Sequence, residues 1–418
     1  MKLIKPFRGL RPTRELASQV ASHPYDVLSR EEAYELSKDN PLSFLHINKP
    51  EIDLDTSIDV HDPRVYEKAA ENLQRFISEG ILQQDGEEKL YVYKQIMGAH
   101  EQVGLVAAAS IDAYEKNLIK KHEYTRPEKE DDRVQHMDAL GAQVGPVFLT
   151  YRANASVDAL IAQVVQTNPE YDFAAEDGTR HVFWVIEDLV LAADIDSAFN
   201  AVECLYVADG HHRSAAASRV RHLYQKRNPD HSGEESYNFF LVVVFPHDQM
   251  QVLDYNRVVR DLNGAEVDEF LGQLGRQFDI TAVTDSGAAK PGAAREFGLY
   301  MKGQWYTARA NPTLLGQIDG SDPVQCLDVS ILQNDIFAPL LGIEDQRTDS
   351  RVDFVGGIRG LQELEKRVDF GDWAMAIALY PTSMDSLMAI ADAGEVMPPK
   401  STWFEPKLKS GLIVHMLD

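Results

Sequence analysis

The chain contains very little cysteine, with only Cys204 and Cys326 in 418 residues. Neither belongs to a CxxC pair or to a cluster with histidine, which argues against a disulfide framework and a structural zinc site. The sequence has no run of 18 apolar residues of the kind that spans a membrane, and its start has no long apolar segment typical of a signal peptide. These absences predict a cytoplasmic protein without a membrane partner.

Positive charge is also scarce, because 41 Lys and Arg stand against 66 Asp and Glu and give a formal net charge of −25 at pH 7. Such a balance repels polyanions, so nucleic acid is not expected as a partner. A small anion is still compatible with it, since a few cations and backbone N–H groups can hold a phosphate against a field screened within roughly 8 Å. The charge therefore directs the search toward a local basic site.

Composition is otherwise that of a globular protein, with 44% hydrophobic and 26% charged residues. The length predicts two or three domains, and a change of composition suggests one boundary near residue 260. Helix and strand patterns are mixed on both sides of it. We expect an α+β fold, with one region over residues 1–260 and a mixed α/β region over 261–418 that returns to the core.

Several elements can be predicted from periodicity and end signals. Ser29 and Glu32 have capping-box spacing at the start of a helix that ends before Pro41. Residues 43–47 resemble a short strand, 65–80 a helix, and 239–245 a central strand. Further on, 287–294 reads as a flexible turn, 297–310 as a hairpin, 329–341 as a helix, and the last residues as a strand.

The strongest local signal is an apolar strand over 204–208 that runs into Asp209-Gly210-His211-His212-Arg213 and an alanine-rich helix. The first N–H groups of a helix lack intrahelical partners and lie at the positive end of the dipole, so this point attracts anions. Gly210 lets a phosphate approach the backbone, and Arg213, expected to be exposed, can contact it. Asp209 can hold Mg²⁺, orient a histidine, or simply cap the helix.

A second candidate segment is the charged run at 120–133, KKHEYTRPEKEDDR. Its ordinary interpretation is a solvated loop followed by a helix start. Its lysines, arginines and carboxylates nevertheless suit a phosphate or metal site.

The segment YVADGHHRSAAA resembles the G-x-[HR]-R-x-x-A phosphate-binding box of the ParB/sulfiredoxin superfold. Over nearly its whole length the chain resembles the domain-of-unknown-function 1015 family, described as SerK-like. The matching motifs are HPYDVLS at 23–29, HEYTRPEKEDDR at 122–133, GTRHVFWVI at 178–186, VADGHHR at 207–213, LDVSILQNDIFAPLLGI at 327–343 and MPPKSTWFEPKLKSG at 397–411.

The resemblance implies a ParB/sulfiredoxin-like core that transfers phosphate from ATP or ADP, with Mg²⁺, to a small hydroxyl compound, of which free L-serine is the first candidate. The residues expected in these roles are Asp26, Asp209, His211 and His212 for catalysis; Gly210, His212, Arg213, Lys129 and Arg133 for the nucleotide; Tyr25, Glu123, Lys400 and Ser401 for the substrate; and Asp209 and Asp132 for a metal ion.

Alternatives remain open at this point. In one alternative, Asp26 has no catalytic role and its side chain forms a hydrogen bond within a turn. Likewise, the loop with Lys400 and Ser401 can be part of a C-terminal tail held across the domain surface. Hydrolysis of a nucleotide or phosphoester would use the same cradle and base. A ParB-like nucleotide-binding regulator is a third function, although the sequence has no evident helix-turn-helix or basic arm for DNA.

Overall fold

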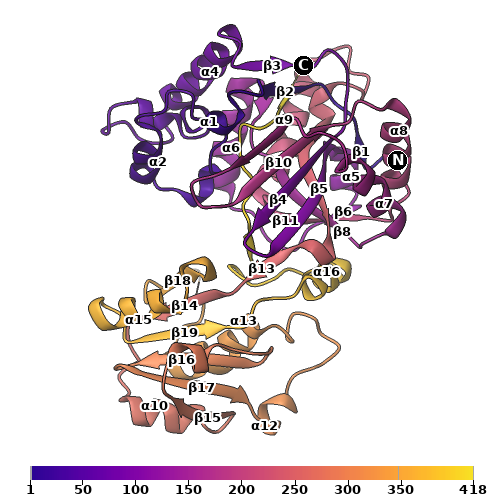
Figure 1. The fold of residues 1–418 in the computed structure, drawn as a ribbon. Coiled ribbons are helices and arrows are strands. Elements are labelled where there is room, and N and C mark those ends of the chain that lie inside the picture. Colours follow the sequence, from indigo (N-terminus) through magenta and orange to yellow (C-terminus); the bar gives the residue numbers. More distant parts are fainter. Residues whose placement is uncertain (1, 347, 418) are drawn as a thin grey trace. The chain divides into compact units, whose positions relative to one another are not determined.

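A computed structural model describes residues 2–346 and 348–417. The chain forms two compact units, one of residues 1–250 together with 406–418 and the other of residues 251–405 (Figure 1). Both mix helices and strands, so the fold is mixed α/β with several sheets. The composition change near residue 260 lies just after β14 (Tyr255–Val259), inside the second unit.

The first unit is built on a nine-stranded sheet. Its strands follow the order β6 (Ile119–Lys120), β11 (Leu205–Asp209), β8 (Val147–Tyr151), β12 (Phe239–Pro246), β5 (His100–Ser110), β4 (Tyr91–Met97), β10 (Arg180–Val185) and β9 (Tyr171–Ala174), with β1 (Ile4–Lys5) paired to β5. The predicted central strand is confirmed, because β12 lies between β5 and β8 and is buried along almost its whole length. A strand buried on both faces is expected to be continuously apolar, as this one is.

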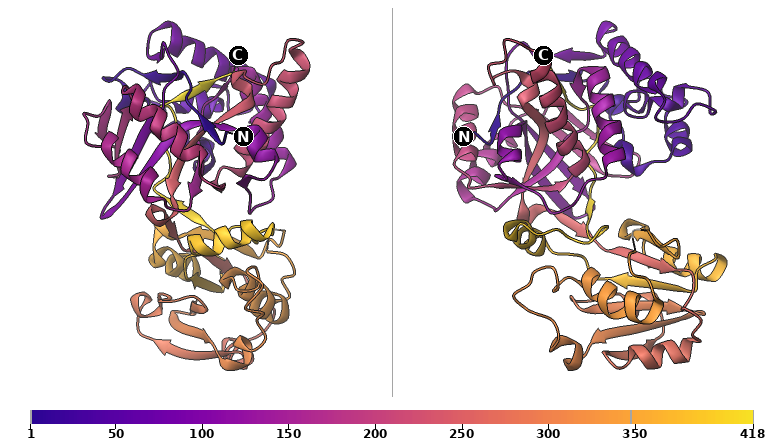
Figure 2. Two further views of the ribbon diagram at one scale, coloured as in Figure 1. Left: turned by 90° about the vertical axis from the view of Figure 1, so that its right-hand side faces the viewer. Right: turned by 180° about the vertical axis from the view of Figure 1, so that it is seen from behind.

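Helices cover this sheet. Helix α9 (His211–Arg227) follows β11 directly and packs beside α6 (Pro127–Leu140), as Figure 2 shows. Other helices of the sheet region are α5 (Ile111–Glu115), α7 (Ala155–Val164) and α8 (Leu189–Asn200). The charged run at 120–133 therefore supplies both the loop after β6 and the first turns of α6.

A smaller layer of helices precedes the sheet: α1 (Ala17–Val20), α2 (Arg30–Ser37), α3 (Leu45–Asn48) and α4 (Pro63–Ser78). The capping box of Ser29 and Glu32 is confirmed at the start of α2, and the long helix is confirmed as α4. The strand predicted at 43–47 is wrong, since these residues enter α3. Five residues are too few for their hydrophobic period to be read, and packing of α3 against α4 decides their conformation.

The end of the chain is built into the first unit. The predicted final strand, β21 (Val414–Met416), joins a four-stranded sheet with β3 (Leu82–Gln84), β2 (Gly9–Pro12) and β7 (Ala142–Gln143). Before it, Ser410 and Ser22 exchange two backbone hydrogen bonds of 2.9 and 3.0 Å. Residues 406–410 are thereby fixed beside the loop that begins at Ser22.

The second unit has a six-stranded sheet in the order β15 (Phe278–Val283), β17 (Gln304–Ala310), β16 (Glu296–Met301), β19 (Met375–Leu379), β14 and β18 (Val352–Gly356), and a separate pair of β13 (Gln251–Leu253) and β20 (Trp403–Glu405). The predicted hairpin is β16 and β17. Its helices include α10 (Val267–Leu274), α12 (Pro312–Leu315), α13 (Asp328–Ile331), α14 (Ala338–Leu341), α15 (Leu361–Phe370) and α16 (Met384–Ala393).

Two details of the second unit differ from the prediction. The helix at 329–341 is present, but its middle turn, Leu332–Phe337, is a π-helix. The stretch predicted as a flexible turn begins inside α11 (Ser286–Ala289), because the Asp285 side chain accepts a hydrogen bond from the backbone of Ala288 and caps a short helix there. In the described part of the chain, no helix combines the length and apolarity needed to cross a bilayer.

Candidate functional site

The turn between β11 and α9 is shaped by Gly210. This residue has φ 99°, in the left-handed region, and it begins α9 without a side-chain cap. A Cβ added there would lie 3.2 Å from Cζ of Arg213. Both the positive φ and the close contact with Arg213 therefore favour glycine here, and the N–H groups of the first turn of α9 are not covered by a capping side chain.

Arg213 is buried, at 6% exposure, although a side chain at a helix start was expected to be exposed. The guanidinium folds back over Gly210 and reaches the carbonyl oxygen of Pro146, to which Nη1 donates a hydrogen bond. Nη2 lies 3.7 Å from Oδ2 of Asp26, while Nε has no hydrogen-bond partner among the residues the structure describes. The sequence could not show that the loop of Pro146 closes over this position.

The positive charge of Arg213 is stabilised by the nearby carboxylates of Asp26 and Asp209. Burial alone would lower the pKa of the guanidinium, but Asp26 and Asp209 outweigh burial and raise the pKa above its ordinary value. Arg213 is thus a buried cation with one unused donor at the positive end of α9.

The HPYDV loop is brought to the same place. Tyr25 and Asp26 form the start of a 3₁₀ turn, Tyr25–Val27. The ring of Tyr25 is stacked against the guanidinium of Arg133 at 3.9 Å, and burial raises the pKa of its hydroxyl to about 12. Asp26 keeps about a third of its side chain exposed, at 35%, and so combines access to solvent with proximity to Arg213.

Asp209 ends β11 and is paired with a lysine from the end of the chain. Its Oδ2 lies 3.1 Å from Nζ of Lys407, whose carbonyl oxygen accepts a hydrogen bond from Gln95. Burial acts to raise the pKa of Asp209, but Lys407 and Arg213 outweigh it and hold the pKa well below its usual range. Asp209 is therefore ionised at neutral pH and is chemically suited to hold a cation such as Mg²⁺.

The two adjacent histidines have different surroundings. His211 is buried, and its Nδ1 lies 3.7 Å from Oε2 of Glu123. His212 is partly exposed, and its Nε2 accepts a hydrogen bond of 3.1 Å from the backbone N–H of Arg126 at the start of α6. Burial is the main cause that lowers the pKa of each ring, so both are neutral near pH 7.

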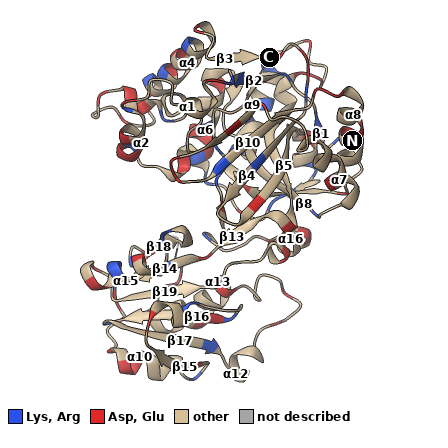
Figure 3. Ribbon diagram, in the orientation of Figure 1, with Lys and Arg blue, Asp and Glu red and all other residues tan. Residues whose placement is uncertain are grey.

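The residues predicted on α6 divide into two kinds. Lys129 is exposed, and its charge reaches far enough to help lower the pKa of His212. Asp132 binds Nη2 of Arg133 at 2.6 Å and accepts a hydrogen bond of 2.8 Å from Tyr66. These partners indicate that Asp132 and Arg133 form a structural ion pair. Helix α6 carries charges of both signs along its length (Figure 3). Phosphate contact by Lys129 and Arg133, and metal contact by Asp132, stay predictions.

Lys400 and Ser401 belong to the second unit. The carbonyl oxygen of Lys400 accepts a hydrogen bond of 2.9 Å from Nη2 of Arg257, and Oγ of Ser401 donates to the carbonyl oxygen of Pro398. Lys400 has φ 59°, so the loop makes a tight left-handed turn there. Their contact with a substrate stays a prediction.

Three residues of the first unit were missed by the sequence reasoning: His122, Lys407 and Lys409. His122 is buried and packs edge to face on His211, with ring centroids 4.4 Å apart. Nζ of Lys409 lies 3.3 Å from Nε2 of His23 and 3.5 Å from Oδ2 of Asp177. All three residues belong to the motifs at 122–133 and 397–411, so the motifs could have pointed to them. The sequence around each residue did not distinguish it from its charged neighbours.

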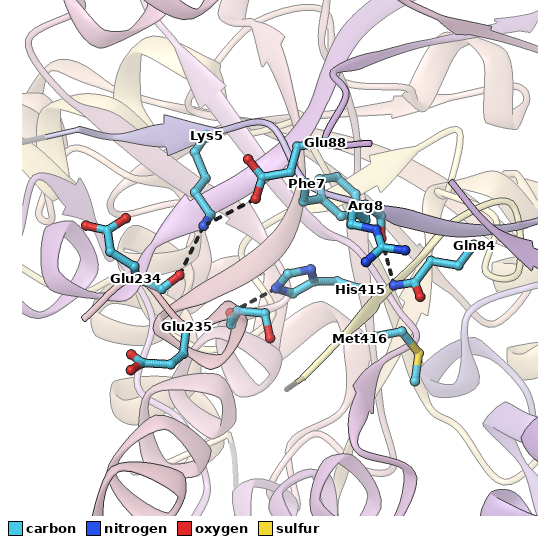
Figure 4. A pocket seen from close by; sticks show the side chains of 10 residues that line it. Lys5, Phe7, Arg8, Gln84, Glu88, Glu234, Glu235, His415 and Met416 are labelled. Carbon is cyan, nitrogen blue, oxygen red and sulfur yellow. Dashed lines mark hydrogen bonds and ion pairs between the residues drawn. The ribbon is translucent and has the colours of Figure 1, made fainter. Parts of the chain in front are cut away.

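A pocket elsewhere in the first unit has a volume of about 280 Å³ and is unrelated to these residues (Figure 4). Lys5 occupies one side of it, with Nζ 3.8 Å from the carboxylate of Glu88 and 3.3 Å from the carbonyl oxygen of Glu234. His415 bonds the carbonyl oxygen of Ser236 at 3.0 Å. These contacts satisfy much of the polar lining, and none of the predicted site residues lines the pocket.

The family model described as "Protein of unknown function (DUF1015)" matches residues 4–330. No curated protein matches the chain. Among solved structures, a free serine kinase in complex with AMP has 11% identity and a TM-score of 0.34, covering 73% of this chain and 92% of its own. A conserved hypothetical protein from Pyrococcus furiosus has 13% identity and a TM-score of 0.32, covering 73% and 95%. SbnI with a C-terminal truncation, from Staphylococcus aureus, has 11% identity and a TM-score of 0.34, covering 72% and 84%. At these TM-scores the function has to be inferred from the side chains of the site.

Proposed function

The chain belongs to the DUF1015 family, and from the site in its first unit we propose that it is a nucleotide-dependent phosphotransferase. The donor is ATP or ADP with Mg²⁺, and the acceptor is a small hydroxyl compound, with free L-serine as the first candidate. One observation carries the proposal: Arg213 is a buried cation over Gly210, and its Nε has no partner within the described residues. We further propose that this turn is a phosphate box of the ParB/sulfiredoxin type.

A phosphate group explains the arrangement around Arg213. An unsatisfied buried donor costs roughly 1–3 kcal/mol, so a position that keeps one is expected to have a ligand. A phosphate offers several acceptor oxygens, which the guanidinium can bind together with the first N–H groups of α9. Gly210 has no side chain to obstruct that approach.

Asp26 is the proposed base. In the transfer, the acceptor hydroxyl oxygen forms a bond to the transferred phosphorus while the bond from phosphorus to the donor's bridging oxygen breaks. The hydroxyl proton passes to the carboxylate of Asp26, which is partly exposed and 3.7 Å from Arg213. Asp26, the proposed base, therefore lies next to Arg213, the group proposed to hold the phosphate.

Mg²⁺, when bound, neutralises charge on the phosphate oxygens, and Asp209 is the residue suited to hold it because Lys407 and Arg213 keep its carboxylate ionised. The remaining assignments are predictions: His211 and His212 assist catalysis, His212, Lys129 and Arg133 contact the nucleotide, and Tyr25 and Glu123 contact the acceptor. The assignment of Lys400 and Ser401, which belong to the second unit, to the acceptor rests on the sequence alone.

Incubation of the full-length protein with L-serine, Mg²⁺ and ATP or ADP tests the proposal. O-phosphoserine is the expected product, and it should be lost in Asp26→Asn. A panel of other small hydroxyl compounds covers a different acceptor. If no compound is phosphorylated and the nucleotide stays intact, the proposal is wrong.

Two outcomes would redirect the assignment. Release of phosphate from the nucleotide without any phosphorylated acceptor would identify a hydrolase that uses the same cradle. Nucleotide-dependent retention of duplex DNA at physiological salt would identify a ParB-like regulator, against the expectation from the net charge of −25.

A further inference from the structure

Three side chains with metal-ligating atoms meet where two parallel strands end. Strands β6 and β11 pair in parallel, with Ile119 opposite Leu205. The segments that leave them at the same edge carry His122 and Glu123 on one side and His211 on the other. We propose that His122, Glu123 and His211 bind a divalent transition-metal ion of the zinc class.

The distances fit such an ion. One ligand atom from each of the three side chains lies within 4.8 Å of the other two, and Nδ1 of His211 is 3.7 Å from Oε2 of Glu123. Metal–ligand bonds of about 2.1 Å in a tetrahedron separate the ligand atoms by about 3.4 Å. The pair of His211 and Glu123 already has almost this spacing, and small side-chain rotations bring the three together.

Unpartnered buried nitrogen atoms are the second observation. His122 is 1% exposed and His211 is 4% exposed. In the described ranges, neither ring nitrogen of His122 has a hydrogen-bond partner, and neither does Nε2 of His211. Burial of polar atoms without partners is unfavourable. The two rings also lie edge to face against each other, so a metal ion can take one nitrogen from each.

The ligand set selects the kind of metal. Two imidazoles and one carboxylate suit zinc and its neighbours, whereas Mg²⁺ prefers oxygen ligands. Three protein ligands leave a fourth position for water or for an oxygen atom of a small molecule, as in catalytic rather than structural zinc sites. The ligand set therefore differs from that of the Mg²⁺ assigned to Asp209. The zinc site shares His211 and Glu123 with the proposed kinase site, but zinc binding can be measured without kinase activity.

Zinc titration of the chelator-treated full-length protein, without nucleotide, tests the site by calorimetry. Glu123→Gln keeps the shape of the side chain and removes its charge, at a position whose side chain is 41% exposed. His122→Gln removes a buried ligand. His222→Gln is the matched control, because His222 forms an exposed pair with Glu115 at 2.9 Å and is not part of the cluster.

We expect one Zn²⁺ per wild-type chain. Since even residues that only orient ligands are worth roughly 10–100-fold in metal affinity, Glu123→Gln should weaken binding at least about 10-fold and His122→Gln about 100-fold, while His222→Gln leaves it unchanged. Circular dichroism checks that each variant is folded; if His122→Gln is not, the comparison of Glu123→Gln with His222→Gln decides.

Absence of saturable Zn²⁺ binding by the wild-type protein would overturn the proposal. So would equal weakening in Glu123→Gln and His222→Gln, because this result would mean that zinc binds to scattered surface groups. Neither result bears on phosphorylation of serine, which is measured separately with Mg²⁺ and nucleotide.

Discussion

Two of the buried arginines, Arg213 in the first unit and Arg257 in the second, are surrounded differently. Arg257 in the second unit is fully buried, and its guanidinium donates to Gln346 and to the carbonyl oxygens of Tyr255 and Lys400. Arg213 in the first unit keeps Nε without a partner in the part of the chain that the structure describes.

Both arginines are charged at neutral pH, but their pKa values are shifted in opposite directions. Arg257 is surrounded by carbonyl and amide oxygens, and burial lowers its pKa to about 9. Arg213 lies near two carboxylates, which raise its pKa. We infer that an arginine whose nitrogen atoms all have protein partners holds the fold together, and we propose that Arg213, whose Nε has no partner among the described residues, is kept for a ligand. Substitutions at and around these two arginines test the contrast between them.

The largest effect is expected from Asp26→Asn, which removes one of the two carboxylates near Arg213. A general base contributes roughly 10²–10⁴-fold to the rate, so the turnover number for phosphoserine formation should fall by that factor. Nucleotide affinity should change little, because the phosphate ligands remain. Turnover within about threefold of wild type would remove Asp26 from the mechanism.

Arg257→Met should cost about 3–5 kcal/mol of unfolding free energy, because several buried oxygen atoms lose their donor together. Urea denaturation followed by fluorescence measures this. Nucleotide affinity of the folded variant should equal that of wild type. If stability is unaffected but nucleotide binding is lost, the structural assignment of Arg257 is wrong.

Lys407→Met tests the ionised state of Asp209 through pH. A carboxyl whose folded pKa is depressed contributes stability that is complete above its ordinary value, 3.8, and is lost as the pH falls through the folded pKa. Without Lys407 the folded pKa of Asp209 should rise, so stability at pH 7 should decrease and its further decline below pH 3.8 should be smaller.

The control for this pH effect is Lys94→Met, which breaks the pair of Lys94 with Glu101 at 2.6 Å. Partly exposed pairs of this kind contribute about 0–1 kcal/mol. Urea unfolding of both variants at pH 7 and pH 3 gives the comparison, and identical pH dependence in the two would show that Lys407 does not hold Asp209 ionised.

Gly210→Ala should have a small effect on stability. A left-handed alanine costs about 1–2 kcal/mol, and its Cβ would press on the guanidinium of Arg213, 3.2 Å away. Gly178→Ala is the matched control, because Gly178 has φ 80° with open space around it. The midpoint temperature of thermal unfolding should fall similarly in both variants, whereas nucleotide affinity should fall only in Gly210→Ala.

Local patterns predict most elements that hold the site. The strand at 204–208, the glycine turn and the following helix can be read from adjacent residues, because hydrophobic period and turn chemistry act over short distances. The exception at residues 43–47 has the same cause, since that run is too short to show a period and its contact with α4 determines its conformation.

Contacts between distant segments could not be predicted. Lys407 pairs with Asp209 across 198 positions of sequence, and this depends on the final segment returning to the first unit. His122 was hidden in a charged run, because its burial follows from the parallel pairing of β6 with β11. Arg213 is buried by the loop that contains Pro146, which lies far from Arg213 in the sequence.

Calorimetric titration of ADP and ATP into wild-type protein and Arg213→Met tests the central claim most directly. Hydrogen bonds to charged groups contribute roughly 1.5–3 kcal/mol, so nucleotide affinity should fall about 10–100-fold in the variant, with a smaller loss of stability than in Arg257→Met. Equal affinity in wild type and Arg213→Met, or no nucleotide binding by either, would contradict the claim that Arg213 is kept for a phosphate.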